Sequence, residues 1–121
     1  MDNTDVVNEL KTWGKWYTNT LNLDGYRLDA VKHIKFSFYS DWLNYERTQT
    51  GKSLFTVGEY WSPYLSSLQN YISKTNRSMY LFNVPLHLNL YNASSGGGNL
   101  QLMEDLTQFG YSNKIFQVKR T

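Results

Sequence analysis

Hydrophobic residues recur along the chain in alternating helical and strand-like patterns. Apolar side chains appear every three or four positions up to Asn22, which predicts a first helix that ends before that residue. Residues 26–31 then alternate between two faces, as expected of a strand, with Arg27 and Asp29 on the polar face. The apolar positions of the helix are Val6, Leu10, Trp13 and Tyr17, and its candidate caps are Asp2, Thr4 and Asp5.

The alternation continues through the next 75 residues, to position 106. The tryptophans and phenylalanine at helical spacing, Trp13, Trp16, Phe38 and Trp42, are predicted to pack between helices and sheet. The further predicted elements are a helix opened by Ser37 or Ser40 and ended near Gly51, a strand over 54–58, a helix beginning at Pro63 with Leu65, Leu68 and Ile72 on its buried face, a strand over 79–84 closed by Pro85, a loop over 92–99 and a short helix over 100–106.

Strands that alternate with helices predict an α/β fold with a parallel sheet, either an open doubly wound sheet or a barrel. An open sheet buries both faces of its central strands and favours continuous apolar runs, whereas residues 26–31 carry Arg27 and Asp29 on one face. Charged side chains near the carboxyl end of a strand are typical of the mouth of a (β/α)8 barrel. Because such a barrel needs about 250 residues, we expect a partial (β/α)8 TIM barrel with about three parallel strands.

The composition of the chain excludes several classes of partner and site. The 121 residues carry a net charge of +2, with no basic run among the aromatic residues, which argues against a nucleic-acid partner. No apolar stretch approaches the roughly 18 residues of a membrane helix, and the polar start is not a signal peptide. The absence of cysteine excludes disulfides and thiolate metal sites.

Two carboxylates are the candidate chemistry of the chain. Asp29 and Glu59 each follow a short apolar segment, and they lie 30 residues apart, which is one strand–helix–strand repeat. The carboxyl ends of adjacent parallel strands lie together, so the two side chains can converge on one ligand. Two acids in this arrangement are the minimal machinery for cleaving a glycosidic bond.

Three segments carry a family resemblance. Residues 24–33, with 34–38 after them, closely resemble the strand-four motif of the α-amylase family (glycoside hydrolase family 13), especially its bacterial liquefying members. Residues 57–61 resemble the strand-five motif, and residues 81–87 resemble the segment around strand six. The resemblance covers about residues 1–106, and the tail 107–121 diverges from it. It implies one incomplete catalytic barrel domain that contains strands four to six.

The resemblance also implies an activity, the retaining endohydrolysis of α-1,4-glucan bonds in starch or glycogen. Asp29 would be the nucleophile, Glu59 the general acid and base, and Arg27 the residue that orients the nucleophile. Lys32, His33, Tyr60 and Trp61 would contact the substrate.

Calcium is the one cofactor that the resemblance implies, with the main-chain carbonyl of His33 as a ligand. The implied partner is an α-glucan polysaccharide, with no nucleic acid and no membrane, and the full-length enzyme would be a monomer. The implied location is extracellular, and a cytoplasmic location stays open.

Departures from the family pattern leave alternatives open. The family also has an early Asn-His segment and a later Asn-His-Asp segment with a third carboxylate, but the two histidines here, His33 and His87, lie in neither. Asn83 stands where relatives usually carry Asp. We therefore expect the 121-residue chain to be inactive alone. The alternatives are a non-catalytic remnant or sugar-binding piece, and a relative that cleaves α-1,6 bonds or transfers glucosyl units.

Overall fold

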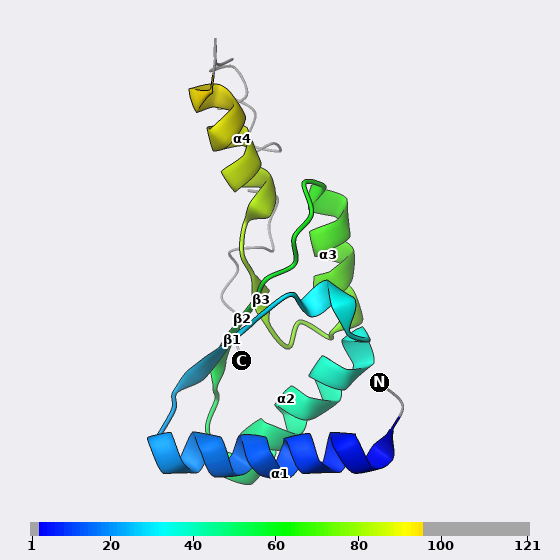
Figure 1. The fold of residues 1–121 in the computed structure, drawn as a ribbon, viewed down its shortest axis with the longest axis vertical. Helices are drawn as coiled ribbons and strands as arrows, with labels where there is room; N and C mark the ends of the chain where they lie inside the picture. The colour runs from blue at the N-terminus through cyan, green and yellow to red at the C-terminus, as the bar shows by residue number, and fades with distance from the viewer. Residues whose placement is uncertain (1–2, 96–121) are drawn as a thin grey trace.

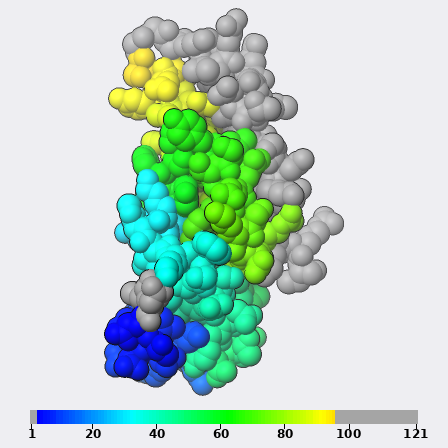
Figure 2. Space-filling view, turned by 90° about the vertical axis from the view of Figure 1, so that its right-hand side faces the viewer, coloured from blue at the N-terminus to red at the C-terminus, as the bar shows by residue number. Residues whose placement is uncertain are grey.

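The computed structural model describes residues 3–95, and the predicted helix over 100–106 and the tail 107–121 lie outside this range. Helices and strands alternate along the described residues, as the sequence pattern predicts, and α1 and α4 lie at opposite ends of the molecule (Figures 1 and 2). The elements are α1 (Thr4–Leu21), β1 (Gly25–Leu28), the short 3-10 helix η1 (Val31–His33), α2 (Phe36–Thr50), β2 (Phe55–Gly58), α3 (Leu65–Lys74), β3 (Tyr80–Leu81) and α4 (Val84–Ser94).

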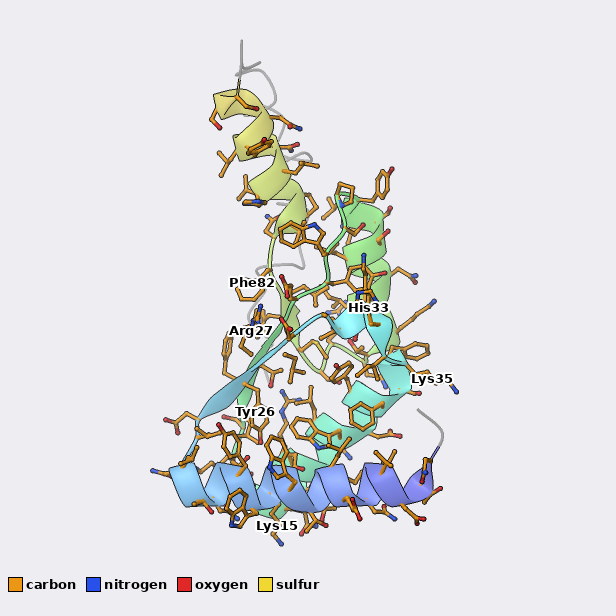
Figure 3. All side chains as sticks on the ribbon, in the orientation of Figure 1. Lys15, Tyr26, Arg27, His33, Lys35 and Phe82 are labelled. Carbon is orange, nitrogen blue, oxygen red and sulfur yellow. The ribbon has the colours of Figure 1, made fainter. Side chains whose placement is uncertain are left out.

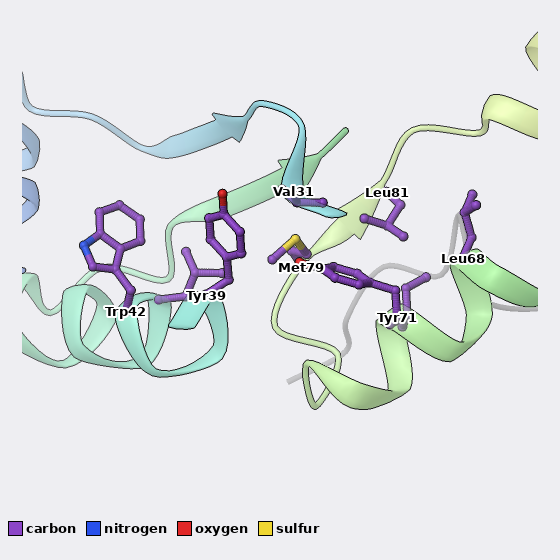
Figure 4. Packing of buried hydrophobic residues seen from close by; sticks show 9 residues of the cluster. Val31, Tyr39, Trp42, Leu68, Tyr71, Met79 and Leu81 are labelled. Atoms are coloured by element: carbon purple, nitrogen blue, oxygen red, sulfur yellow. The ribbon is translucent and has the colours of Figure 1, made fainter. Parts of the chain in front are cut away.

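The three strands form one parallel sheet in the order β1-β2-β3. In β1 and β2 the register pairs Gly25 with Phe55 and Leu28 with Gly58, and Gly58 also pairs with Leu81 of β3. The crossover helices α2 and α3 both lie on the same face of this sheet (Figure 4). Helices on one face leave the other face free for the interior of a barrel, so the expectation of an α/β fold with three parallel strands is confirmed.

The hydrophobic core lies between this sheet and the two crossover helices (Figure 4). Trp42 is buried and Phe38 packs against the core, as expected. Its buried members are Val31, Tyr39, Trp42, Leu43, Leu68, Tyr71, Ile72, Met79 and Leu81.

Trp13 and Trp16 do not belong to this core, contrary to the prediction, because they are 49% and 59% exposed. The buried positions of α1 are instead Gly14 and Thr18. The small glycine lets α2 approach α1 closely, and the ring of Trp13 stacks on Tyr17, with 5.0 Å between the centroids, along the outer side of α1.

The ends of the first elements differ from the sequence prediction. The side chain of Asn3 accepts hydrogen bonds from the first turn of α1, and the predicted caps Thr4 and Asp5 lie within the helix. The third predicted cap, Asp2, lies outside the described residues. The helix ends at Leu21, before Asn22, as expected, and Asn22 caps it in the left-handed conformation. The strand predicted over 26–31 ends at Leu28, and α2 begins at Phe36 after Lys35 rather than at a serine cap.

Helix α4 is absent from the sequence prediction, which placed a strand over 79–84 and a loop from residue 92. The strand is only Tyr80–Leu81, and Pro85 lies in the first turn of α4 instead of closing a strand. Proline suits that position because its missing N–H would have no helical partner there. The side chain of Asn83 caps the helix by accepting from the Leu86 N–H at 3.0 Å. No helix within residues 3–95 has the length and apolar character of a membrane span.

Arg47 of α2 ties the crossover helix to the sheet. Its guanidinium donates to the carbonyl oxygens of Ser53, Leu54 and Ser78 at 2.9, 3.1 and 2.7 Å. A fourth contact reaches the Thr56 hydroxyl at 3.3 Å. The cation therefore satisfies backbone carbonyls at the entrance of both β2 and β3.

We expect Arg47→Ala to lower the free energy of unfolding by about 2–4 kcal/mol, because it removes the arginine donor from the partly buried carbonyls of Leu54 and Ser78. The Leu54 carbonyl keeps a second donor, the Thr56 hydroxyl, at 3.0 Å. Urea denaturation followed by tryptophan fluorescence measures this loss. The matched control is Arg77→Ala, which removes an exposed arginine and should change stability by less than about 0.5 kcal/mol. Equal losses in the two variants would contradict a structural role for Arg47.

Candidate active site

The two acids lie side by side at the carboxyl ends of adjacent parallel strands. Leu28 pairs with Gly58, so Asp29 and Glu59, which follow these residues, leave the sheet at the same level. The Glu59 N–H donates to the Leu28 carbonyl at 2.8 Å, and the Val31 N–H donates to the Glu59 carbonyl at 3.0 Å. These bonds extend the ladder past the strand ends and fix the backbone of both acids.

Arg27 contacts both carboxylates. One terminal nitrogen of its guanidinium lies 2.6 Å from Asp29 Oδ1, and the other lies 3.1 Å from Glu59 Oε2 (Figure 3 labels Arg27). The neighbours of Arg27 in the strand, Tyr26 and Leu28, pack against the core, so Arg27 projects from the face opposite the helices. The cluster is accessible, with side-chain exposures of 72% for Asp29 and 27% for Glu59.

The contact between Arg27 and Glu59 is missing from the sequence reasoning, which paired Arg27 with Asp29 alone. The register supplies the signal: Arg27 pairs with Val57, and Glu59 lies two residues beyond Val57 on the same face. The register of β1 and β2 therefore determines that Arg27 lies beside both acids.

Ala30 turns the chain sharply after Asp29. It has φ 46° and ψ 43°, the left-handed conformation, which costs a residue with a Cβ about 1–2 kcal/mol. The turn ends the strand immediately after the acid and starts η1, which carries Lys32 and His33. Strained backbone of this kind concentrates at functional sites.

The four residues predicted to contact substrate lie in two groups. Lys32 donates to the main-chain carbonyl of Trp61 at 2.8 Å, which joins η1 to the segment after β2. The Trp61 side chain is 55% exposed, and its ring centroid lies 5.6 Å from that of His87 in α4. His87 thus lies in a helix, and its ring packs against Trp61.

His33 and Tyr60 line a pocket of about 370 Å³ between η1 and α3, together with Lys32. The Tyr60 ring packs on that of Tyr71, with 4.9 Å between the centroids, and is partly buried against the core. None of Arg27, Asp29 and Glu59 lines this pocket. The structure thus brings Arg27 and the two acids together, and it places His33 and Tyr60 in a separate depression.

The described residues do not form a calcium site. Within residues 3–95 no three His, Asp or Glu side chains gather as metal ligands. Calcium takes six to eight oxygen ligands, so the carbonyl of His33 cannot hold the ion without donors from elsewhere.

No family model matches the chain. It is, however, 61% identical over 107 residues to an α-amylase of Geobacillus stearothermophilus, a match that covers 88% of the chain. The chain matches one segment of the bacterial α-amylases. It also matches the cytoplasmic α-amylase of Escherichia coli, with 37% identity over 105 residues and 87% of the chain. It spans only about a fifth of the length of these two α-amylases, 20% and 21%.

A solved α-amylase shares the fold. The crystal structure of the α-amylase from Geobacillus thermoleovorans, complexed with acarbose, superposes with a TM-score of 0.67 and 26% identity, over 76% of this chain and 20% of that one. The resemblance to the α-amylase family is confirmed, and so is the expected partial (β/α)8 barrel with three parallel strands.

Proposed function

We propose that this chain forms the part of an α-amylase barrel that carries the catalytic nucleophile and the general acid/base. The complete enzyme would hydrolyse internal α-1,4 bonds of starch or glycogen with retention of configuration. The observation that carries the proposal is the contact of one guanidinium, that of Arg27, with both Asp29 and Glu59 at the ends of adjacent strands. Retaining glycosidases need two carboxyls within about 5–5.5 Å of each other, and a shared arginine holds such a pair together.

The proposed reaction is a double displacement. Asp29 attacks the anomeric carbon while Glu59 protonates the departing glycosidic oxygen, which gives a covalent glycosyl-enzyme. Glu59 then removes a proton from water, which attacks the same carbon and releases Asp29. Arg27 orients both carboxylates through charge-assisted hydrogen bonds.

The proposed substrate contacts come from the segment after β2. The exposed ring of Trp61 offers an apolar surface for a sugar face, and the hydrogen bond from Lys32 fixes the backbone that carries it. His33 and Tyr60 would contribute through the neighbouring pocket. In the complete enzyme we also propose that calcium binds at the His33 carbonyl, with further ligands from outside residues 3–95. Residues 1–121 would form part of a single catalytic domain, and the enzyme would be monomeric and extracellular.

A segment exchange tests the proposal. The matched 107 residues of the Geobacillus stearothermophilus α-amylase are replaced by the corresponding residues of this chain. We expect a chimera that unfolds cooperatively, hydrolyses linear maltodextrin and leaves isomaltose intact. A folded chimera without activity would favour a non-catalytic segment, and one that cleaves isomaltose would favour an α-1,6-specific relative.

A further inference from the structure

Glu46 of α2 is a fully buried acid, with an exposed fraction of 0%. Both of its carboxyl oxygens lack a hydrogen-bond partner among the described residues. The carboxyl lies at the contact between α1 and α2, because a Cβ added to Gly14 of α1 would come within 2.5 Å of Glu46 Oε1. The missing side chain at Gly14 is what makes room for the acid.

The charged groups around Glu46 do not pair with it. On α1, the amine of Lys15 donates to Gln49 at 3.3 Å, and the amine of Lys11 lies 5.4 Å from the centre of the Tyr45 ring. Both lysines attract the carboxylate only at a distance. On the α2 side, the guanidinium of Arg47 donates to the carbonyls that precede β2 and β3.

Tyr26 of β1 is a further titratable group near the acid. Its hydroxyl forms a hydrogen bond with Thr18 of α1, and it lies between β1 and α1 (Figure 3). Burial raises the pKa of Tyr26, as does the proximity of Glu46 to a smaller extent. This tyrosine therefore stays neutral across the physiological range and supplies no compensating charge.

We propose that Glu46 is a proton-controlled lock between α1 and α2: the neutral acid lets the helices pack, and its ionisation loosens α1. An ionised carboxylate without a partner is far more costly to bury than a neutral carboxylic acid. Thr18 of α1 forms a hydrogen bond with Tyr26 of β1. Loosening of α1 therefore also disturbs β1, the strand that carries Arg27. The proposal does not depend on the proposed catalytic function.

The direction of the pH dependence follows from the pKa. Burial raises the pKa of Glu46 to about 7, although Lys15 and Lys11 partly oppose the shift, whereas an unfolded chain has a glutamate pKa of about 4.3. The folded state therefore holds more protons than the unfolded state between these values. The contribution of Glu46 to stability is therefore fully present below about pH 4.3, falls as the pH rises towards 7, and levels off above it.

Glutamate carboxyl titration by ¹³C NMR on the full 121-residue chain tests the lock. We expect one carboxyl with a midpoint near neutral pH, which disappears in Glu46→Gln and persists in Glu9→Gln, a matched change on the exposed side of α1. Where Glu46→Gln fails to fold, Glu46→Met replaces it. Ordinary midpoints for all glutamates would overturn the proposal.

Urea denaturation supplies the second readout. Between pH 4.5 and pH 8 the folding equilibrium constant of the unmodified chain should fall about 100-fold more than that of Glu46→Met. Glu9→Gln should follow the unmodified chain. Parallel pH profiles for all three proteins would refute the lock even if the NMR midpoint were raised.

Discussion

Asp29→Asn should reduce kcat/KM of the chimeric amylase for maltodextrin by at least about 10⁴-fold, because an amide cannot form the glycosyl-enzyme. Glu59→Gln should reduce it by about 10²–10⁴-fold through loss of the acid and base. Initial rates of reducing-sugar release, with thermal unfolding to confirm the fold, measure both effects. These are the largest changes expected of any single substitutions in the segment.

The matched control for the two acids is Glu9→Gln, which removes a carboxylate on the exposed side of α1. We expect its kcat/KM to stay within about twofold of the parent, since surface changes away from a site have small effects. If Asp29→Asn kept activity within tenfold of the parent, the nucleophile would have to be another residue. Substrates with a good leaving group should rescue Glu59→Gln and leave Asp29→Asn inactive, which separates the two roles.

Gly25→Ala should lower the free energy of unfolding by about 2–4 kcal/mol, which is a large effect on stability for a single substitution. Gly25 pairs with Phe55, and a Cβ at this position would lie 2.1 Å from the Phe55 carbonyl oxygen. The obstacle is backbone, which cannot rotate away as a flexible side chain could. Strands β1 and β2 would have to separate at the start of their ladder. The same ladder aligns Leu28 with Gly58 and so positions the two acids that follow them. Urea denaturation measures the loss.

Gly51→Ala is the comparison for Gly25→Ala. Gly51 has φ +68° and no atom within 4 Å of an added Cβ, so alanine there meets only backbone strain, which costs about 1 kcal/mol. A loss for Gly25→Ala no larger than that for Gly51→Ala would show that the contact between the strands yields more easily than its geometry indicates.

Local sequence patterns predicted the structure correctly where a pattern is compatible with only one structure. The polar face of residues 26–31 placed Arg27 and Asp29 away from the core, and the structure puts Tyr26 and Leu28 against the core. The spacing of Asp29 and Glu59 predicted adjacent carboxyl ends, which the parallel register of β1 and β2 confirms. Their catalytic roles stay predictions that rest on family resemblance.

Local patterns failed where tertiary contacts decide the outcome. Trp13 and Trp16 are apolar at helical spacing, but the pattern does not show which side of α1 meets α2, and that contact goes through Gly14. Helix α4 was missed because an apolar run followed by Pro85 fits both the end of a strand and the first turn of a helix. The contact of Arg27 with Glu59 needs the strand register, which no short stretch of sequence encodes.

The most direct test of the site is to trap its covalent intermediate. A fluorinated α-maltosyl fluoride, which forms the glycosyl-enzyme readily and releases it slowly, is incubated with the chimera, and the labelled peptide is sequenced by mass spectrometry. The proposed mechanism expects the added sugar on Asp29, and a longer-lived adduct in the Glu59→Gln variant. A label on another residue, or none in a chimera that hydrolyses maltodextrin, would contradict the assignment of Asp29 as nucleophile.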